Sequence, residues 1–166
     1  NLPEIHPKEN QTKENEIIIL NGEWKISSMT PNCLTLDFCQ YRVENSGYSR
    51  ILPVLQVQEE IKNYIGKKLK LKYEFELEIQ HKLLNELFLI AEYRDDVIIK
   101  LNGNQITFNK NNWWLDISFK KAQINDFLRD GVNLIEYETV IKSDTEVESI
   151  YLIGDFTVKS YTDRIF

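Results

Sequence analysis

The stretch LKLKYEFELEI, residues 69–79, decides the fold class of this chain. Large apolar side chains occupy every second position from Leu69 to Ile79, and lysine or glutamate occupies each position between them. Because neighbouring side chains on a β-strand point to opposite faces, the pattern predicts a strand with one face on a core and the other in water.

Shorter runs of the same kind predict further strands on both sides of this stretch. They cover residues 34–43, 87–91, 97–101, 135–141 and 150–158. The run from Leu87 to Ala91 is apolar at every position, which suggests a strand covered on both faces, although a buried helical turn would show the same pattern. Asn21-Gly22 and Asn102-Gly103 each predict a hairpin, because both residue types tolerate the positive φ of a type I′ turn.

Two segments favour short helices. Val54, Val57, Ile61 and Ile65 share one helical stripe that ends at Gly66, and a second helix is plausible over residues 121–129. We therefore expect an all-β fold, an antiparallel two-sheet jelly-roll sandwich with one or two short helices. The sandwich should span residues 17–166, because residues 1–16 are too polar and too rich in proline to form more than a linker or N-terminal arm.

The amino-acid composition limits the classes of binding partner that we expect for this chain. The 166 residues include 26 acidic and 20 basic side chains, a formal charge of -6, so the basic field that nucleic acid or anionic lipid requires is absent. No apolar run approaches the ~18 residues of a spanning helix, and the N-terminus is too polar for a secretory signal. Cys33 and Cys39 lie about 20 Å apart if their segment is extended, so we expect free thiols, which mildly favour a cytoplasmic location.

The residues from which many active sites are built are scarce. His6 lies in the polar arm and His81 ends a strand, and neither has a recognisable partner for nucleophilic catalysis. The two cysteines have no neighbouring histidine for a zinc site, and no glycine-rich phosphate loop is present. We expect no cofactor and no catalytic residue in this chain.

Acidic residues gather in one expected loop, where Glu92, Asp95 and Asp96 surround Arg94. Three interpretations stay open. The group can be a solvated turn, because acidic residues favour local hydrogen bonding there. It can also be a loop that binds sugar hydroxyls, or a structural calcium site, although calcium takes about six to eight oxygen ligands and no spaced loop collects them here.

The dipeptide Trp113-Trp114 predicts one buried and one outward indole. On a strand, Trp113 would share the core face with Leu115, Ile117 and Phe119, and Trp114 would point outward beside Asp116. An outward indole next to a carboxylate can stack on a sugar ring, and it can equally contact a neighbouring domain.

Three stretches then suggest a family. Residues 96–104 (DVIIKLNGN), 114–118 (WLDIS) and 128–135 (LRDGVNLI) resemble the sugar-binding domain of family 2 glycoside hydrolases and rhamnosidase-like enzymes. Residues 32–39 and 150–158 are similar to parts of the accessory domains of bacterial multidomain members. The resemblance covers roughly residues 17–160 and rests mainly on turns that build the fold.

This resemblance implies a galactose-binding-like jelly roll that is a non-catalytic accessory module of a glycoside hydrolase. The acid pair of such an enzyme lies on a separate barrel domain, and no catalytic residue of the family is matched here. The implied partners are carbohydrate and the catalytic domain of the same polypeptide. The candidate carbohydrate-binding residues are Trp114, Asp116, Asn104, Arg94, Asp95 and Asp96. The alternatives are a purely structural interaction sandwich without a ligand and a small stand-alone enzyme.

Overall fold

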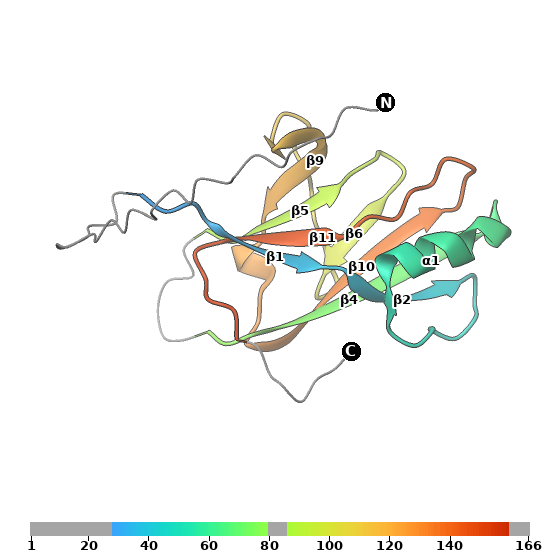
Figure 1. Ribbon diagram of the computed structural model, residues 1–166, viewed down its shortest axis with the longest axis horizontal. Helices are drawn as coiled ribbons and strands as arrows, with labels where there is room; N and C mark the ends of the chain where they lie inside the picture. Colours follow the sequence, from blue (N-terminus) through green and yellow to red (C-terminus); the bar gives the residue numbers. More distant parts are fainter. Residues whose placement is uncertain (1–27, 80–85, 160–166) are drawn as a thin grey trace, which may run out of the picture.

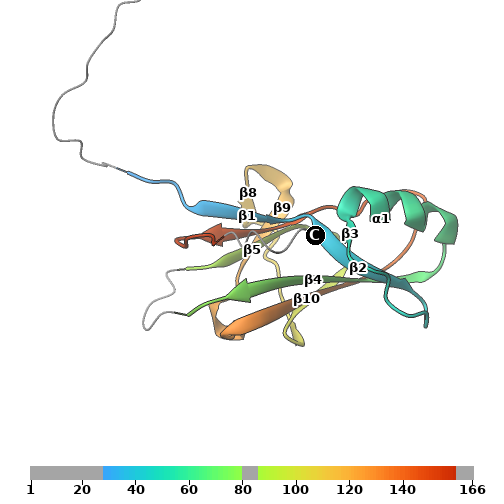
Figure 2. The ribbon, with the colours of Figure 1, turned by 60° about the horizontal axis from the view of Figure 1, so that its bottom comes forward.

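A computed structural model describes residues 28–79 and 86–159 of the chain. Two antiparallel sheets face each other as a sandwich, and one short helix lies at its edge (Figures 1 and 2). The strands are β1 Asn32–Leu36, β2 Phe38–Val43, β3 Leu52–Pro53, β4 Lys68–Leu77, β5 Phe88–Glu92, β6 Ile98–Leu101, β7 Asn104–Gln105, β8 Trp113–Trp114, β9 Asp116–Gln123, β10 Gly131–Val140 and β11 Ile150–Gly154. The expected all-β sandwich of the jelly-roll class is confirmed.

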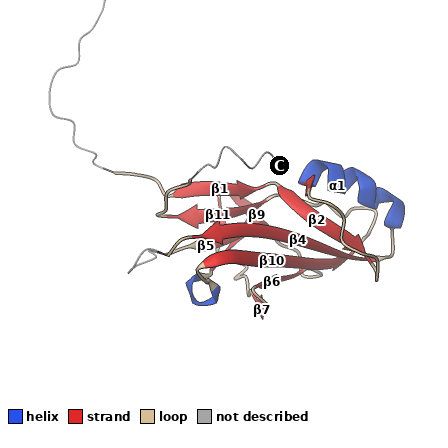
Figure 3. Ribbon diagram, turned by 90° about the horizontal axis from the view of Figure 1, so that it is seen from below, coloured by secondary structure: helices blue, strands red, loops and turns tan. Residues whose placement is uncertain are grey.

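The two sheets differ in size, and strands that follow one another in the sequence often belong to different sheets. The smaller sheet has the order β1-β11-β5-β9-β8, and the larger has the order β3-β2-β4-β10-β6-β7. Figure 3 shows β1, β11 and β5 in one layer and β2, β4 and β10 in the other. The chain passes between the layers at most connections, so each layer is built from segments far apart in the sequence.

The alternating stretch of residues 69–79 forms most of β4, in the middle of the larger sheet. Leu69, Leu71, Tyr73 and Phe75 are buried in the core between the sheets, as the alternation predicts. β4 pairs with β10 over the full length of both strands, from Lys68 opposite Val140 to Leu77 opposite Gly131. The strand that the sequence marks most clearly is therefore the one that anchors the larger sheet.

The continuous apolar run forms β5, as expected of a strand covered on both faces. Leu89 and Ala91 belong to the central core. Ile90 points to the other side of the sheet and is still buried, although it is not part of that core. The outer face of the smaller sheet therefore buries apolar surface of its own.

One expected strand, over residues 34–43, is wrong as a single element. It divides at Asp37 into β1 of the smaller sheet and β2 of the larger sheet. The carbonyl of Asp37 accepts a hydrogen bond from the backbone N–H of Val54 at 2.8 Å, which holds the crossing point against the start of the helix. Cys33 on β1 is exposed, Cys39 on β2 is buried, and both are free thiols.

The first expected helix is confirmed and the second is wrong. Helix α1, Val54–Ile61, buries three of the four stripe residues and continues as a 3-10 turn, Lys62–Tyr64. Residues 121–123 belong to β9, because they pair with β5 and strand pairing outweighs the local helical pattern. Only a short 3-10 turn, Asn125–Phe127, remains of the second helix.

The hairpin expected at Asn102-Gly103 joins β6 and β7. The φ angles there are 51° and 84°, the two positive values that a type I′ turn requires. The other expected hairpin, at Asn21-Gly22, and the arm of residues 1–16 lie outside the described residues. Among the described residues, no helix is both long enough and apolar enough to span a bilayer.

Candidate functional site

The hairpin of β8 and β9 carries the tryptophans, and it corrects the expectation for Trp113. That residue does not lie in the core, because 50% of it is exposed. The strand expected through residues 113–120 is interrupted at Leu115, whose φ of 60° makes a tight turn that pairs Trp114 with Asp116. The alternating apolar set therefore lies at an exposed hairpin, where Leu115 is 86% and Ile117 is 70% exposed.

Trp114 is partly buried and does not stand free as a platform. The Nζ atom of Lys121 lies 5.3 Å from the centre of its ring and 3.8 Å from the centre of the Phe88 ring. Both distances are within reach of a cation–π contact. Lys121 therefore ties Trp114 to the outer face of the smaller sheet.

Asp116 is engaged within its own turn. Its Oδ1 atom accepts hydrogen bonds from the backbone N–H and the hydroxyl of Ser118, at 2.7 and 2.6 Å. These two bonds lower the pKa of Asp116 below its ordinary value. The carboxylate stabilises the start of β9, and its other oxygen, Oδ2, takes part in neither of these bonds.

The loop that contains Arg94, Asp95 and Asp96 joins β5 to β6, and its charged side chains form several ion pairs. Lys110 lies 2.9 Å from Asp95, and Arg94 lies 3.3 Å from Asp96. Lys142 also binds Asp96 and holds the pKa of that carboxyl below its usual range. Each carboxylate therefore has a cation beside it, which fits a solvated turn and leaves sugar binding as a prediction.

Asn104 lies at the opposite end of β6 from this loop. Asp96 precedes the strand and Asn104 follows it, and the strand of four residues holds its ends about 10 Å apart. By contrast, the N–H of Tyr93 donates to the carbonyl of Ser118 at 3.4 Å, which places the start of the loop beside the start of β9. The structure thus brings Trp114, Asp116 and the Arg94 loop to one end and leaves Asn104 at the other.

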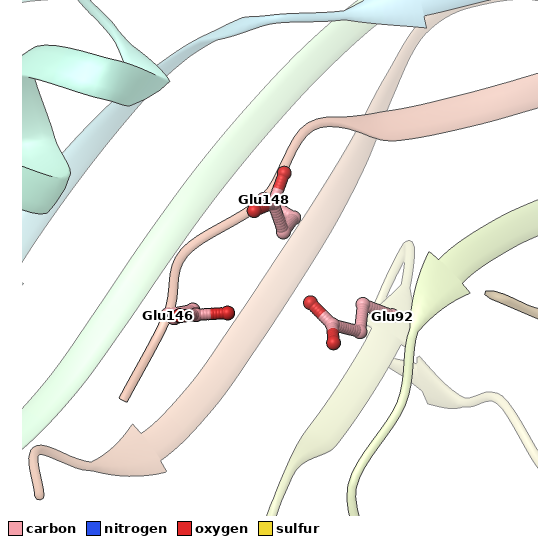
Figure 4. A group of neighbouring side chains, drawn as sticks. All are labelled: Glu92, Glu146 and Glu148. Carbon is pink, nitrogen blue, oxygen red and sulfur yellow. The ribbon is translucent and has the colours of Figure 1, made fainter. Parts of the chain in front are cut away.

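Sequence reasoning missed a cluster of three glutamates at this end. Glu92, at the end of β5, meets Glu146 and Glu148, which precede β11, and one carboxylate oxygen of each lies within 4.8 Å of the others (Figure 4). Partial burial of Glu92, together with the charges of Glu148 and Glu146, raises the pKa of Glu92. Only the fold brings these residues together, so no local motif could have revealed them.

Two kinds of chemistry could use such a cluster. Calcium takes about six to eight oxygens, more than these three carboxylates supply. Retaining glycosidases use two carboxyl groups about 5 Å apart, but they hold a sugar between them in a cleft. Two concavities on the described surface, about 400 and 390 Å³ in volume, are lined by other residues.

Comparisons with known proteins point to one kind of fold. No model of a known protein family matches the chain, and no curated protein is similar to it. Several solved structures are similar. They include an FMN-binding β-glucuronidase from Facaelibacterium prausnitzii L2-6, with 14% identity, a TM-score of 0.54, and coverage of 76% of this chain and 23% of that one.

Two further β-glucuronidases agree with it. The enzyme from Dictyoglomus thermophilum is 16% identical with a TM-score of 0.53, and the match covers 80% of this chain and 29% of that one. The enzyme from an uncultured Clostridium is 11% identical with a TM-score of 0.51, over 82% and 31% of the two chains. The resemblance to a domain of multidomain glycoside hydrolases is therefore confirmed for the fold. The chain spans 23–31% of the length of these enzymes.

Proposed function

We propose that this chain is a non-catalytic accessory module of a multidomain glycoside hydrolase and that it packs against the catalytic domain of the same polypeptide. The observation that carries the proposal is the exposed β8–β9 hairpin. Trp113, Leu115 and Ile117 present large apolar side chains to solvent at alternate positions of one short hairpin. Such clustered exposure is typical of an interaction surface, whereas scattered single apolar residues are ordinary.

The hairpin is held firmly enough to act as a docking element. The N–H of Lys121 donates to the carbonyl of Asn112 at 3.0 Å, and the Nζ of Lys120 donates to the carbonyl of Lys110 at 2.9 Å. A surface that is already ordered loses little conformational entropy when a partner covers it. Burial of each large apolar side chain then contributes about 1.5–3 kcal/mol.

The packing role is tested by hydrogen exchange of residues 113–117 in two contexts. The isolated chain is compared with the longest polypeptide that the gene encodes around it. We expect slower exchange of these residues in the longer polypeptide and unchanged exchange in the β6–β7 hairpin, which serves as the internal control. Equal exchange in both contexts, or a gene that encodes no glycosidase domain, contradicts the proposal.

The non-catalytic role is tested directly with aryl glycosides. We expect no turnover by the isolated chain above the rate of buffer alone. Turnover that disappears in Glu92→Gln would instead assign catalysis to the glutamate cluster, because the pKa of Glu92 is raised. A purely structural sandwich would behave as a non-catalytic module in this assay, so the neighbouring domains encoded by the gene separate those two functions.

Carbohydrate binding at Trp114 is a second candidate function. It is favoured by one observation, the placement of the partly exposed Trp114 at the same end as Asp116 and the Arg94 loop. Titration of oligosaccharides against the chain, followed by tryptophan fluorescence, tests it with Trp114→Phe as the variant. A signal that is the same in the variant and in the unaltered chain rules out this site.

A further inference from the structure

A concavity of about 400 Å³ opens at the end of the larger sheet, beyond β2. We call it the tyrosine concavity, and its aromatic and polar lining consists of Tyr41, Glu44, Ser46, Ser49, Tyr64 and Lys67. One wall is the loop from β2 to β3, and the other is the turn that follows helix α1. No residue of the glutamate cluster or of the β8–β9 hairpin lines it.

The wall from the β2–β3 loop is ordered by hydrogen bonds. The N–H of Ser49 donates to the carbonyl of Tyr41 at 2.8 Å, and the Oγ of Ser49 accepts from the N–H of Tyr41 at 3.0 Å. Glu44, with a φ of 53°, donates its N–H to the carbonyl of Lys68 and accepts the N–H of Lys68 on its carboxylate. The left-handed backbone of Glu44 is thus compensated by two bonds that close the base of the loop.

The wall that follows α1 is equally fixed. Gly66, with a φ of 84°, donates its N–H to the carbonyl of Ile141 at 2.7 Å. The N–H of Ile141 returns a bond of 2.9 Å to the carbonyl of Lys67. A surface concavity between two ordered walls is preformed, and small-molecule sites are usually preformed too.

Two polar groups of the lining make no hydrogen bond or ion pair among residues 28–79 and 86–159, although Tyr64 interacts electrostatically with Tyr41. The hydroxyl of Tyr64, a residue that is 44% exposed, makes no hydrogen bond there, and the Nζ of Lys67 makes neither a hydrogen bond nor an ion pair. The hydroxyl of Tyr41, by contrast, donates to Glu60 Oε2 at 2.6 Å. That bond fixes the Tyr41 ring and leaves Tyr64 and Lys67 to meet a ligand.

The lining chemistry selects a kind of ligand. Tyrosine rings pack against the C–H face of a saturated ring, and the serine, tyrosine and lysine groups can exchange hydrogen bonds with hydroxyls. The charges of Glu44 and Lys67 have opposite sign, and Glu60 lies beside Tyr41. These residues therefore give the concavity no net positive charge that would attract an anionic ligand. A neutral ring that carries several hydroxyl groups satisfies all of these conditions.

We propose that the tyrosine concavity is a binding site for a neutral pyranose sugar, with the ring against Tyr64 and its hydroxyls within reach of Lys67 and Ser46. This site is separate from the β8–β9 hairpin and does not depend on the packing role. It also differs from the Trp114 candidate, which lies on the other sheet.

Saturation-transfer NMR on the unaltered chain tests the site with three probes. They are methyl β-D-glucopyranoside, methyl β-D-galactopyranoside and methyl α-L-rhamnopyranoside, each at millimolar concentration. We expect transfer to the ring C–H protons of at least one probe. Free D-glucuronate serves as the anionic control, and we expect it to bind at least tenfold more weakly than the best neutral probe.

Two variants locate the binding without disturbing the fold. Tyr64→Ala removes a partly exposed ring. Gly47→Gln adds a side chain to a residue that lines the concavity, at a position where a Cβ meets no atom within 4 Å. We expect each variant to weaken binding at least tenfold with an unchanged melting temperature, and we expect Trp114→Phe to bind normally.

Three outcomes overturn the proposal. They are the absence of transfer to all three neutral probes, binding that survives both Tyr64→Ala and Gly47→Gln, and binding that is lost in Trp114→Phe. None of these outcomes bears on hydrogen exchange at the β8–β9 hairpin, so failure here is distinguishable from failure of the packing role.

Discussion

The backbone of Leu115 is the most unusual feature at the scale of single residues. A left-handed backbone at a residue other than glycine lowers the stability of the fold by roughly 1–2 kcal/mol, and asparagine tolerates this conformation better than leucine does. Leu115 adopts a φ of 60° with its side chain 86% exposed, so its side chain gains little within the domain. Strain of this kind motivates a functional hypothesis, and here the apolar side chain suits a partner.

The first prediction concerns this strain. Leu115→Asn should raise the free energy of unfolding of the isolated chain by about 1 kcal/mol, because the left-handed backbone is then easier to adopt. Urea denaturation followed by circular dichroism measures the change. Ile117→Asn is the matched control, since Ile117 is similarly exposed but has no positive φ, and it should not stabilise the chain. A destabilised Leu115→Asn variant would show that the leucine side chain matters within the domain.

The second prediction concerns the pH dependence of Glu92. Its pKa is raised in the folded chain, first by partial burial and then by Glu148 and Glu146. The folded state therefore binds the proton more tightly than the unfolded state, so the ionised carboxylate reduces stability above the folded pKa and this loss is relieved as the pH falls through it. Glu92→Gln should stabilise the chain at pH 7. The gain should be less than about 1 kcal/mol, because the repulsion between neighbouring like charges is of that size.

The same reasoning fixes the pH profile and the control for Glu92. The advantage of Glu92→Gln should shrink as the pH is lowered through the folded pKa and vanish below the ordinary glutamate pKa, where both states hold the proton. Glu146→Gln relieves part of the same repulsion from an exposed position, so its effect should be smaller. Melting temperatures between pH 4 and pH 8 measure both, and an advantage that grows in acid would contradict the sign.

At the scale of elements, the fully buried Asn133 holds the β6–β7 hairpin to the start of β10. Its Oδ1 atom accepts from Asn102 Nδ2 at 2.8 Å and from the N–H of Arg129 at 3.0 Å. Its Nδ2 atom donates to the carbonyls of Arg129 and Gly131, at 2.8 and 2.9 Å. The amide is thus satisfied on both sides, which explains the asparagine of Gly131-Val132-Asn133 at the start of β10 as part of the fold.

The third prediction follows from this network. Asn133→Ala should lower the free energy of unfolding by about 3 kcal/mol, because buried partners in one network lose their hydrogen bonds together. Asn104→Ala is the matched control, since Asn104 is an exposed asparagine of the same hairpin, and it should change stability by less than ~0.5 kcal/mol. Chemical denaturation compares the two, and similar values would mean that the network contributes little.

An element of this fold can be predicted from the sequence where its local pattern of apolar and polar residues alone determines its structure. β4 could be predicted because its alternation is unbroken and one of its faces is buried. The division at Asp37 could not, because residues on both sides of it, such as Leu36 and Cys39, are apolar and enter the same core from different sheets. Residues 121–123 joined a strand because of their pairing with β5, which no local pattern contains.

At the scale of the whole molecule, the candidate site likewise depends on contacts between distant segments, which no local sequence pattern contains. Arg94, Asp95 and Asp96 could be placed in a loop from their own neighbourhood, but their ion pairs with Lys110 and Lys142 depend on the fold. The polar side chain of Asn104 suggests the same site, but the length of β6 separates Asn104 from Arg94, Asp95 and Asp96. The sequence pattern places Trp113 in the core because the positive φ lies at Leu115, and leucine is not a residue that normally marks a positive φ.

The last prediction separates the isolated module from the assembled molecule. The double variant Trp113→Ser, Ile117→Thr should leave the melting temperature of the isolated chain nearly unchanged, because both side chains are at least half exposed there. In the longer polypeptide the same variant should weaken the packing between domains by about 2–4 kcal/mol, since two large apolar side chains lose their burial. Differential scanning calorimetry of both forms measures the contrast, with Ile98→Thr, an exposed residue on the other sheet, as the control. If the double variant destabilises both forms equally, the hairpin serves the sandwich itself and the docking role is wrong; if it destabilises only the longer form, the exposed apolar residues of this module are explained by the domain that covers them.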